Sequence, residues 1–258
     1  MSFPESAAAQ FIPCKVCRSP APLFGAADFN KSCEERRGVR LPHYGFAVYY
    51  RRCPSCGFLF TDCFDRWSHA EFRQHIYNSA YVQVDPDYKE KRPLEAATLI
   101  AGLFEARKTT LSVLDYGGGS GLFAERLRMS GFSDCNTYDP FTPGFDKPPD
   151  KTYGLITCFE TLEHTPDPTA CVQAIGESLR PDGLVVFSTL VQPPEFEKLG
   201  INWWYVAPRN GHISIHSAKS LALLWEAQGF ALTSVSGDVH IARRKSVAGQ
   251  MPAGFAAA

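Results

Sequence analysis

A strand-to-helix turn that contains four glycines constrains this chain more than any other feature. Leu111–Tyr116 has the apolar pattern of a buried strand, 121–129 has the pattern of a helix, and Gly117, Gly118, Gly119 and Gly121 stand at their junction. Glycines at such a junction let the backbone turn tightly and approach a ligand that a Cβ would push away. The sequence therefore predicts an α/β fold with a ligand site at a strand end.

Two acidic residues narrow the class of ligand. Asp115 stands two residues before the first glycine, and Asp139 lies 22 residues after Gly117, at the end of the next predicted strand. A carboxylate at that place can accept hydrogen bonds from both hydroxyls of a ribose. A glycine-rich turn alone also occurs in dinucleotide enzymes. The turn and the second acid together predict a ligand that contains a ribose.

Strand and helix patterns alternate along the rest of the chain, which is typical of an α/β sheet. Further strands are predicted to end at 136–139 and to span 153–158, 184–190, 231–236 and 239–242. Helices are predicted at 121–129, 170–179 and 220–228, and Arg180–Gly183 is a predicted turn between helix and strand. We expect a Rossmann-like, mostly parallel sheet with an antiparallel final strand.

The form Asp-x-Gly-x-Gly-x-Gly and its spacing to Asp139 resemble class I S-adenosylmethionine-dependent methyltransferases. The resemblance continues through 155–164 and 179–183, and more weakly to residue 242. It implies that the glycine loop lies along the methionine part of the cofactor, that Asp115 orders the loop and that Asp139 holds the ribose. The residues that it implies for the cofactor are Asp115, Tyr116, Gly117, Gly118, Gly119, Gly121, Asp139, Pro140, Phe159 and Glu160.

The chain departs from this family between the second and fourth strands. Residues 140–151 contain four prolines where the family usually has a third strand and a helix. We therefore expect the third strand to be short or missing.

Glu160, Glu163 and His164 form a Glu-x-x-Glu-His motif after the fourth expected strand. This motif resembles two groups of metal-assisted O-methyltransferases, those of ubiquinone biosynthesis and those that act on the 2′-hydroxyl of small RNA. There the acids and the histidine hold a divalent ion, which polarises a substrate hydroxyl. The alternative is a common loop form in which Asp167 caps the next helix. The candidate catalytic residues are Glu163, His164, His212 and His216, and which histidine is the base stays open here.

Two Cys-x-x-Cys pairs lie near the N-terminus: Cys14 with Cys17, and Cys53 with Cys56, 35 residues apart. Two residues between thiolates let one tight turn offer both sulfurs to one ion, so two such turns form a tetrahedral site suited to zinc. Four thiolates leave no open position, which predicts a structural zinc. The pattern resembles the N-terminal zinc module of bacterial sugar C-methyltransferases, in which a Tyr-rich link follows; Tyr77 and Tyr81 fall in that link.

These patterns divide the chain into four parts. Residues 1–65 form a zinc-ribbon-like module, 66–110 a helical linker or substrate cap, 111–245 the S-adenosylmethionine-binding domain, and 246–258 a flexible tail. Residues 202–210 form an aromatic insertion that is expected to cover the pocket and exclude water.

The charge balance bears on the methyl acceptor. The chain has 26 Lys and Arg against 27 Asp and Glu, without the basic excess that a nucleic-acid backbone usually requires. We therefore favour a small-molecule acceptor, such as a sugar or glycan-linked intermediate. The alternatives are an RNA methyltransferase whose zinc module recognises RNA, and a catalytically silent cofactor-binding or zinc interaction protein.

The N-terminal sequence lacks the basic start and apolar core of a signal peptide, and no apolar run approaches the length of a membrane span. These features predict a cytoplasmic protein without a membrane partner. The nine cysteines are then expected as thiols or metal ligands rather than disulfides. The oligomeric state does not follow from the sequence.

Overall fold

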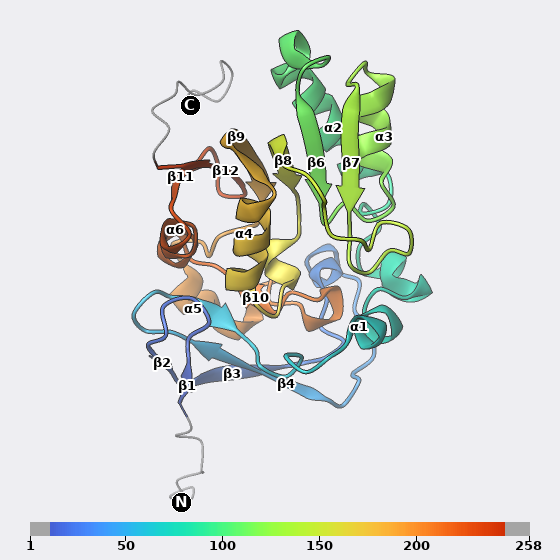
Figure 1. Cartoon of the computed structure of the whole chain (residues 1–258). Coiled ribbons are helices and arrows are strands. Elements are labelled where there is room, and N and C mark those ends of the chain that lie inside the picture. The colour runs from blue at the N-terminus through green and yellow to red at the C-terminus, as the bar shows by residue number, and fades with distance from the viewer. Residues whose placement is uncertain (1–10, 246–258) are drawn as a thin grey trace, which may run out of the picture.

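The computed structural model describes residues 11–245 (Figure 1). The predicted tail at 246–258 and the first ten residues of the predicted zinc module lie outside this range. Two sheets dominate the described chain, a six-stranded central sheet and a four-stranded sheet formed mostly by the N-terminal part of the chain.

The central sheet has the strand order β11-β12-β9-β8-β6-β7. Its strands are β6 Ser112–Tyr116, β7 Asp134–Tyr138, β8 Tyr153–Cys158, β9 Leu179–Ser188, β11 Phe230–Ser234 and β12 Val239–Arg244. The pairs β6–β7, β6–β8 and β8–β9 are parallel, whereas β12 runs antiparallel to both β9 and β11. The predicted Rossmann-like sheet with an antiparallel final strand is confirmed.

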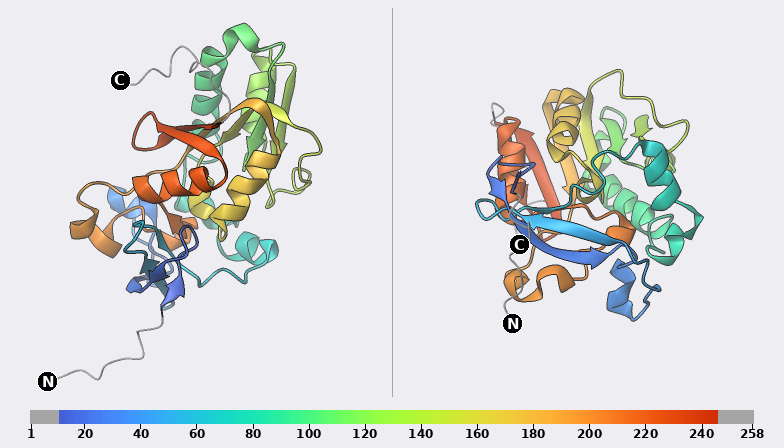
Figure 2. Two further views of the ribbon diagram at one scale, coloured as in Figure 1. Left: turned by 60° about the vertical axis from the view of Figure 1, so that its left-hand side comes forward. Right: turned by 90° about the horizontal axis from the view of Figure 1, so that it is seen from below.

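Helices cover both faces of this sheet (Figure 1 and Figure 2). One face, which includes Val113, Leu155 and Val186, packs against α2 Lys91–Leu103 and α3 Leu122–Met129. The opposite face, which includes Leu114, Ile156 and Val185, packs against α4 Pro168–Glu177 and α6 Ala218–Ala227. Successive residues of a strand point to opposite faces, so these continuous apolar strands supply two cores.

The structure differs from one predicted strand boundary and agrees with the expected lack of a third strand. Residues 180–183, predicted as a turn before a strand, lie within β9, where the register against β8 shifts between Tyr153 and Leu155. Within residues 11–245 the sheet ends at β7, and the proline-rich segment before β8 forms no strand. Proline has no amide hydrogen to donate to a neighbouring strand, so the four prolines of 140–151 leave few donors for a further strand beside β7.

The N-terminal sheet has the order β10-β5-β4-β3, with all pairs antiparallel. Its strands are β3 Leu23–Asp28, β4 Ala47–Arg52, β5 Leu59–Phe60 and β10 Ser214–Ile215, beside a hairpin of β1 Ile12–Pro13 and β2 Pro20–Ala21. The first 65 residues thus do not complete this sheet by themselves, because β10 comes from the far end of the chain. Trp203, Tyr205 and Ile213 share its apolar core with Val48 and Phe64.

Short helices lie in the connections between the strands. They are η1 Cys33–Arg37, α1 His69–His75, η2 Ser79–Gln83, η3 Glu105–Arg107, η4 Leu162–His164, α5 Phe196–Leu199, η5 Gly200–Asn202 and η6 Pro208–Asn210. The arrowheads of β6 and β7 point toward the N-terminal sheet in Figure 1. The carboxyl ends of these parallel strands therefore face that sheet. No helix within residues 11–245 is long and apolar enough to cross a bilayer.

Candidate active site

The glycine loop between β6 and α3 has little room for side chains. Gly117, Gly119 and Gly121 have φ of 78°, 54° and 78°, a region that other residues rarely adopt. A Cβ on Gly117 would lie 2.3 Å from Thr161 Oγ1, and one on Gly118 would lie 2.1 Å from Asp115 Oδ2. A Cβ on Gly119 would have no atom within 4 Å. The loop is thus packed against the sheet on one side and open to a ligand at Gly119.

Asp139 ties the glycine loop to the end of β7. One carboxylate oxygen accepts a hydrogen bond from the Gly119 amide at 2.9 Å, and the other accepts one from the Phe141 amide at 2.8 Å. Pro140 follows directly and is half-buried. The carboxylate therefore lies beside the open face of the loop, which is the place that the sequence predicts for a ribose. Tyr116 differs: its side chain packs into the core against Tyr138, with ring centroids 5.0 Å apart, so only its backbone borders the loop.

Asp115 supports the loop by packing. Its Oδ1 accepts a hydrogen bond from Thr157 Oγ1 at 3.2 Å, whereas its buried Oδ2 has no hydrogen-bond partner in the described residues. Burial raises the pKa of Asp115 to about 7. That Asp115 orders the loop stays a prediction, and the closeness of its Oδ2 to Gly118 supports it.

The raised pKa of Asp115 predicts a pH-dependent stability. An acid with a folded pKa above its unfolded value stabilises the fold below the unfolded pKa, and this contribution is lost as pH rises through the folded pKa. For Asp115, we expect the unfolding free energy of the cofactor-free protein to fall by roughly 4 kcal/mol between pH 4 and pH 8. Urea unfolding at both pH values measures it. Glu160, whose pKa is also raised to about 7, adds to the fall, so Asp115→Asn should reduce the measured fall by the Asp115 share and leave the rest. Equal slopes in both proteins would contradict the assignment.

Glu160 has a strained backbone where β8 ends. Its φ of 49° is left-handed, which costs on the order of 1–3 kcal/mol and is held only when the surroundings require it. Ser188 Oγ accepts a hydrogen bond from the Glu160 amide at 2.9 Å and donates one to its carboxylate at 2.7 Å. Burial, and then the charge of Glu163, raise the pKa of Glu160 to about 7. This carboxyl group can therefore donate or accept a proton near neutral pH.

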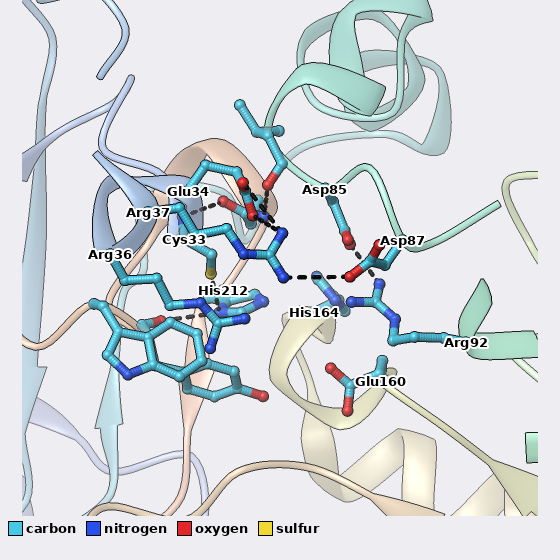
Figure 3. Close-up of a pocket in the computed structure, with 14 residues that line it drawn as sticks. Cys33, Glu34, Arg36, Arg37, Asp85, Asp87, Arg92, Glu160, His164 and His212 are labelled. Carbon is cyan, nitrogen blue, oxygen red and sulfur yellow. Dashed lines mark hydrogen bonds and ion pairs between the residues drawn. The ribbon is translucent and has the colours of Figure 1, made fainter. Parts of the chain in front are cut away.

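A cavity of about 90 Å³ lies beyond Glu160 (Figure 3). Four segments surround it: η1, residues 84–92, the end of β8 with η4, and residues 204–212. The lining residues are Cys33, Glu34, Arg36, Arg37, Val84, Asp85, Asp87, Arg92, Glu160, His164, Trp204, Tyr205, Asn210 and His212. The predicted aromatic insertion thus contributes Trp204 and Tyr205 to the wall.

His164 and His212 present free ring nitrogens at this cavity. Nδ1 of His164 lies 3.2 Å from the Gly211 carbonyl, and Nδ1 of His212 lies 2.9 Å from the Tyr205 carbonyl. A carbonyl accepts only, so each Nδ1 carries the proton and each Nε2 keeps its lone pair. Burial lowers the pKa of both histidines. Both rings are therefore neutral at physiological pH and can accept a proton or bind a metal. Their centroids lie 5.0 Å apart.

Glu163 lies behind the two histidines and is fully buried. Its Oε1 accepts a hydrogen bond from Tyr205 Oη at 2.7 Å, and its Oε2 has no partner in the described residues. One ligand atom from each of Glu163, His164 and His212 lies within 4.8 Å of the others. The structure therefore groups three of the four predicted catalytic residues.

His216, the fourth candidate, does not line the cavity. Its ring packs against Phe58 with centroids 4.7 Å apart, it is fully buried, and burial lowers its pKa to about 3. Phe58 belongs to the apolar cluster around the four cysteines, so His216 packs beside that cluster and we do not retain it as a base.

Several residues of the cavity had no signal in the sequence. Arg36 stacks on Trp204 at 4.0 Å, Arg92 pairs with Asp85, and Arg37 bridges to Asp87 at 3.3 Å. Charged residues normally belong to the solvated surface, and only tertiary packing brings these to one cavity. Unlike the two cysteine pairs, these charged residues show no repeated spacing in the sequence.

The four predicted metal-binding cysteines meet at one point. Cys14 and Cys56 Sγ lie 3.6 Å apart, and Cys17 and Cys53 Sγ lie 3.4 Å apart. Sulfurs placed tetrahedrally at 2.3 Å from a zinc ion would be about 3.8 Å apart, so the cluster fits this ion. The residue after each pair, Arg18 and Gly57, has a positive φ, and its amide donates to the carbonyl of the first cysteine. Both pairs are thus tight turns.

Comparison with known proteins places these features in a family. The model of a family described as "Methyltransferase domain" matches residues 88–235. The ubiquinone biosynthesis O-methyltransferase of Neisseria meningitidis serogroup A is 43% identical over 44 residues, 17% of this chain and 18% of that protein. The protein of the same name from Bordetella avium is 36% identical over 80 residues, 30% of this chain and 33% of that one. The matches thus span a third or less of these two relatives.

Two solved structures show the same fold. The magnesium protoporphyrin IX methyltransferase of Synechocystis PCC 6803, with S-adenosylhomocysteine bound, has a TM-score of 0.50 and 11% identity; the match covers 69% of this chain and all of that one. The 1,6-didemethyltoxoflavin-N1-methyltransferase of Burkholderia thailandensis has a TM-score of 0.51 and 16% identity, over 79% of this chain and 98% of that one.

Proposed function

We propose that the chain, which belongs to the methyltransferase domain family, uses S-adenosylmethionine to methylate a small molecule held in the cavity beside Glu160, His164 and His212. One observation carries this proposal. Thr161 touches Gly117 of the cofactor loop, while its neighbour Glu160 lines the cavity. The segment at the end of β8 thus separates the proposed cofactor site from the proposed acceptor site by a single layer of residues.

The chain has the groups needed to hold S-adenosylmethionine. We assign its ribose to Asp139, its methionine part to the loop of Gly117–Gly121, and contacts at the strand end to Pro140, Phe159 and Glu160. When bound, this cofactor supplies a methyl group that is already activated on a sulfonium. Catalysis then requires alignment of the acceptor and removal of its proton.

His164 is the proton acceptor in this proposal. Its Nδ1 is engaged by Gly211, so its Nε2 is the free base at the cavity. A Cβ at Gly211 would lie 3.0 Å from both His164 Nδ1 and Tyr77 Oη, so glycine there allows the three groups to pack closely. His212 and Glu160 complete a polar wall that can orient the acceptor and take up the proton.

The group of Glu163, His164 and His212 also offers a divalent-ion site, which is the second candidate. The buried, unpartnered Glu163 Oε2 supports it, because a bound cation would satisfy that atom. An ion there would polarise the acceptor hydroxyl, and His164 would then act as a ligand. The metal content of the parent and of Glu163→Gln decides between His164 as the base and a divalent-ion site. Two ions per chain in the parent and one in the variant favour the divalent-ion site.

The acceptor is proposed as a small, polar molecule, such as a sugar or glycan-linked intermediate. The lining of the cavity supports this class, because arginine and carboxylate side chains can bond to hydroxyl groups. The proposal of a sugar acceptor also rests on the resemblance of the cysteine pattern to that of sugar C-methyltransferases. An RNA acceptor is less favoured because the chain has a net charge of −1, and a silent protein is less favoured because the glycine loop and Asp139 are intact.

We further propose that the cysteine cluster holds one structural zinc ion in the first part of the chain. The helical segment at 66–110 acts as the substrate cap, since its residues 84–92 line the cavity. The remainder, up to residue 245, binds the cofactor.

Asp139→Ala is expected to weaken binding of S-adenosylmethionine by ten- to a hundredfold, because a charge-assisted hydrogen bond contributes roughly 1.5–3 kcal/mol. The same change frees the Gly119 amide and loosens the loop. Isothermal titration calorimetry measures the effect. Asp134→Ala, on the same strand and bonded to Lys151, is the matched control and should retain the parental affinity. An unchanged affinity in Asp139→Ala would refute the ribose assignment.

A further inference from the structure

Lys15 lies inside the first cysteine turn, between Cys14 and Cys17, and its side chain is only 12% exposed. Its ammonium group donates to the Pro166 carbonyl at 2.9 Å and to the Thr61 carbonyl at 3.0 Å, and it pairs with Asp65. All three of its donors are therefore used. Pro166 is two residues after His164, so a side chain of the cysteine cluster directly holds the loop of the proposed base.

A second contact joins the same two segments. Thr169 Oγ1 donates to the Lys15 carbonyl at 3.2 Å, so the first turn of α4 is fixed to the cysteine turn from the other side. The segment from Pro166 to Thr169 is thus clamped between the Lys15 side chain and the Lys15 backbone.

The second cysteine turn reaches the proposed active site through backbone hydrogen bonds. It leads into β5, after which the Thr61 amide donates to the Ile213 carbonyl at 3.1 Å. The Ile213 amide in turn donates to the Glu163 carbonyl at 2.9 Å. Because Ile213 follows His212 and Glu163 precedes His164, this ladder fixes the two histidines relative to each other.

Side chains reinforce this connection. Ser217 Oγ donates to the Cys56 carbonyl at 2.6 Å, and Gln192 Nε2 donates to the Gly57 carbonyl at 2.8 Å. Ser214 Oγ donates to the Thr165 carbonyl at 2.6 Å. By contrast, no hydrogen bond described within residues 11–245 joins either cysteine turn to the glycine loop.

We infer that Lys15 is a positioning residue, which transmits the geometry of the cysteine cluster to the acceptor half of the active site and not to the cofactor half. The cysteine cluster then has a second role besides stabilising the N-terminal sheet, because an ordered cluster sets the position of the loop that carries His164. The inference rests on the proposed function only where it names this loop as catalytic.

Hydrogen–deuterium exchange of the full-length, metal-loaded chain tests this inference without a known acceptor. Lys15→Met keeps the apolar stem and all four thiols but leaves the Thr61 and Pro166 carbonyls without their donor. We expect amide exchange in 159–168 and 209–216 to accelerate by roughly tenfold. Exchange in 113–125, the metal content and the affinity for S-adenosylmethionine should stay at parental values.

Two further variants serve as controls. Lys15→Arg should restore much of the protection, since guanidinium can donate to the same carbonyls. Lys31→Met removes another buried lysine of the N-terminal region, whose ammonium donates to the Trp203 carbonyl at 2.8 Å and to Val206. It should accelerate exchange at 203–206 and leave 159–168 unchanged.

Unchanged exchange in 159–168, or equal acceleration along the whole chain, would overturn the inference. If Lys15→Met loses its metal, the exchange of Thr169→Val is measured instead. This variant removes the hydrogen bond from Thr169 to the Lys15 carbonyl and leaves the sequence of the cysteine turn unchanged. Acceleration at 159–168 with full metal content then supports the inference, and no change there overturns it. Failure of the proposed function would appear separately, as loss of cofactor binding in the parent protein.

Discussion

Cys53→Ser is expected to release the metal ion from the cysteine cluster and to unfold the N-terminal sheet. The strands β1, β2 and β5 have only two residues each, too few to be stable without a further constraint. Structural zinc sites contribute apparent binding free energies of about 10–16 kcal/mol in small peptides, so loss of one ligand removes a large share of local stability. Elemental analysis and limited proteolysis of residues 11–65 measure both effects.

The damage should extend beyond the first 65 residues, because β10 pairs with β5 and because Trp203 and Ile213 share the N-terminal core. Cys14→Ser should behave in the same way. Cys63→Ser is the matched control, since this cysteine lies outside the cluster, and it should retain one ion per chain. A parental metal content in both Cys14→Ser and Cys53→Ser would show that the cluster holds no metal.

His164→Ala is expected to lower the turnover rate by two to four orders of magnitude, the usual contribution of a general base. The affinity for S-adenosylmethionine should stay within about twofold of the parent value, because the glycine loop and Asp139 are separate from His164. The rate is measured with an acceptor identified by transfer of labelled methyl groups to pools of small polar molecules. Because burial lowers the pKa of His164, parental activity should fall only as pH drops below the ordinary histidine range.

A comparison of three histidines separates the roles that the sequence left open. His212→Ala should also lower turnover, whereas His216→Asn should leave the turnover rate near the parental value while it lowers the melting temperature. The ring of His216 is part of the core, so its loss creates a packing defect and not a chemical one. Retained turnover in His164→Ala, or loss confined to His216→Asn, would refute the assignment of the base.

The fold followed from the sequence where local chemistry determines it. Gly117, Gly119 and Gly121 adopt positive φ, the cysteine pairs form tight turns, and continuous apolar strands require two covered faces, so these features were predicted with their residues. The prolines after Asp139 likewise predicted that the third strand would be short or missing. The bulge at residues 180–183 was missed, because a Pro-Asp-Gly sequence has the same local chemistry in a turn and in an interrupted strand.

The candidate site was predictable only in part, because much of it is assembled by long-range contacts. Glu163 and His164 were identified from the Glu-x-x-Glu-His motif, and His212 as a histidine that follows the aromatic insertion. The segments that carry Arg36, Asp85 and Arg92 contain no sequence motif. The pairing of β10 with β5 joins residues more than 150 positions apart, and no local signal indicates it. His216 was included with His212 because both lie in one short segment, and burial places the former in the core.

Titration of the purified chain with S-adenosylmethionine and with NAD, together with the metal content of the same sample, tests the central claim most directly. We predict saturable binding of one S-adenosylmethionine per chain, no binding of NAD, and at least one metal ion per chain retained through dialysis. Binding of NAD, or of neither compound, would contradict the assignment of the glycine loop and Asp139 as a methyltransferase cofactor site.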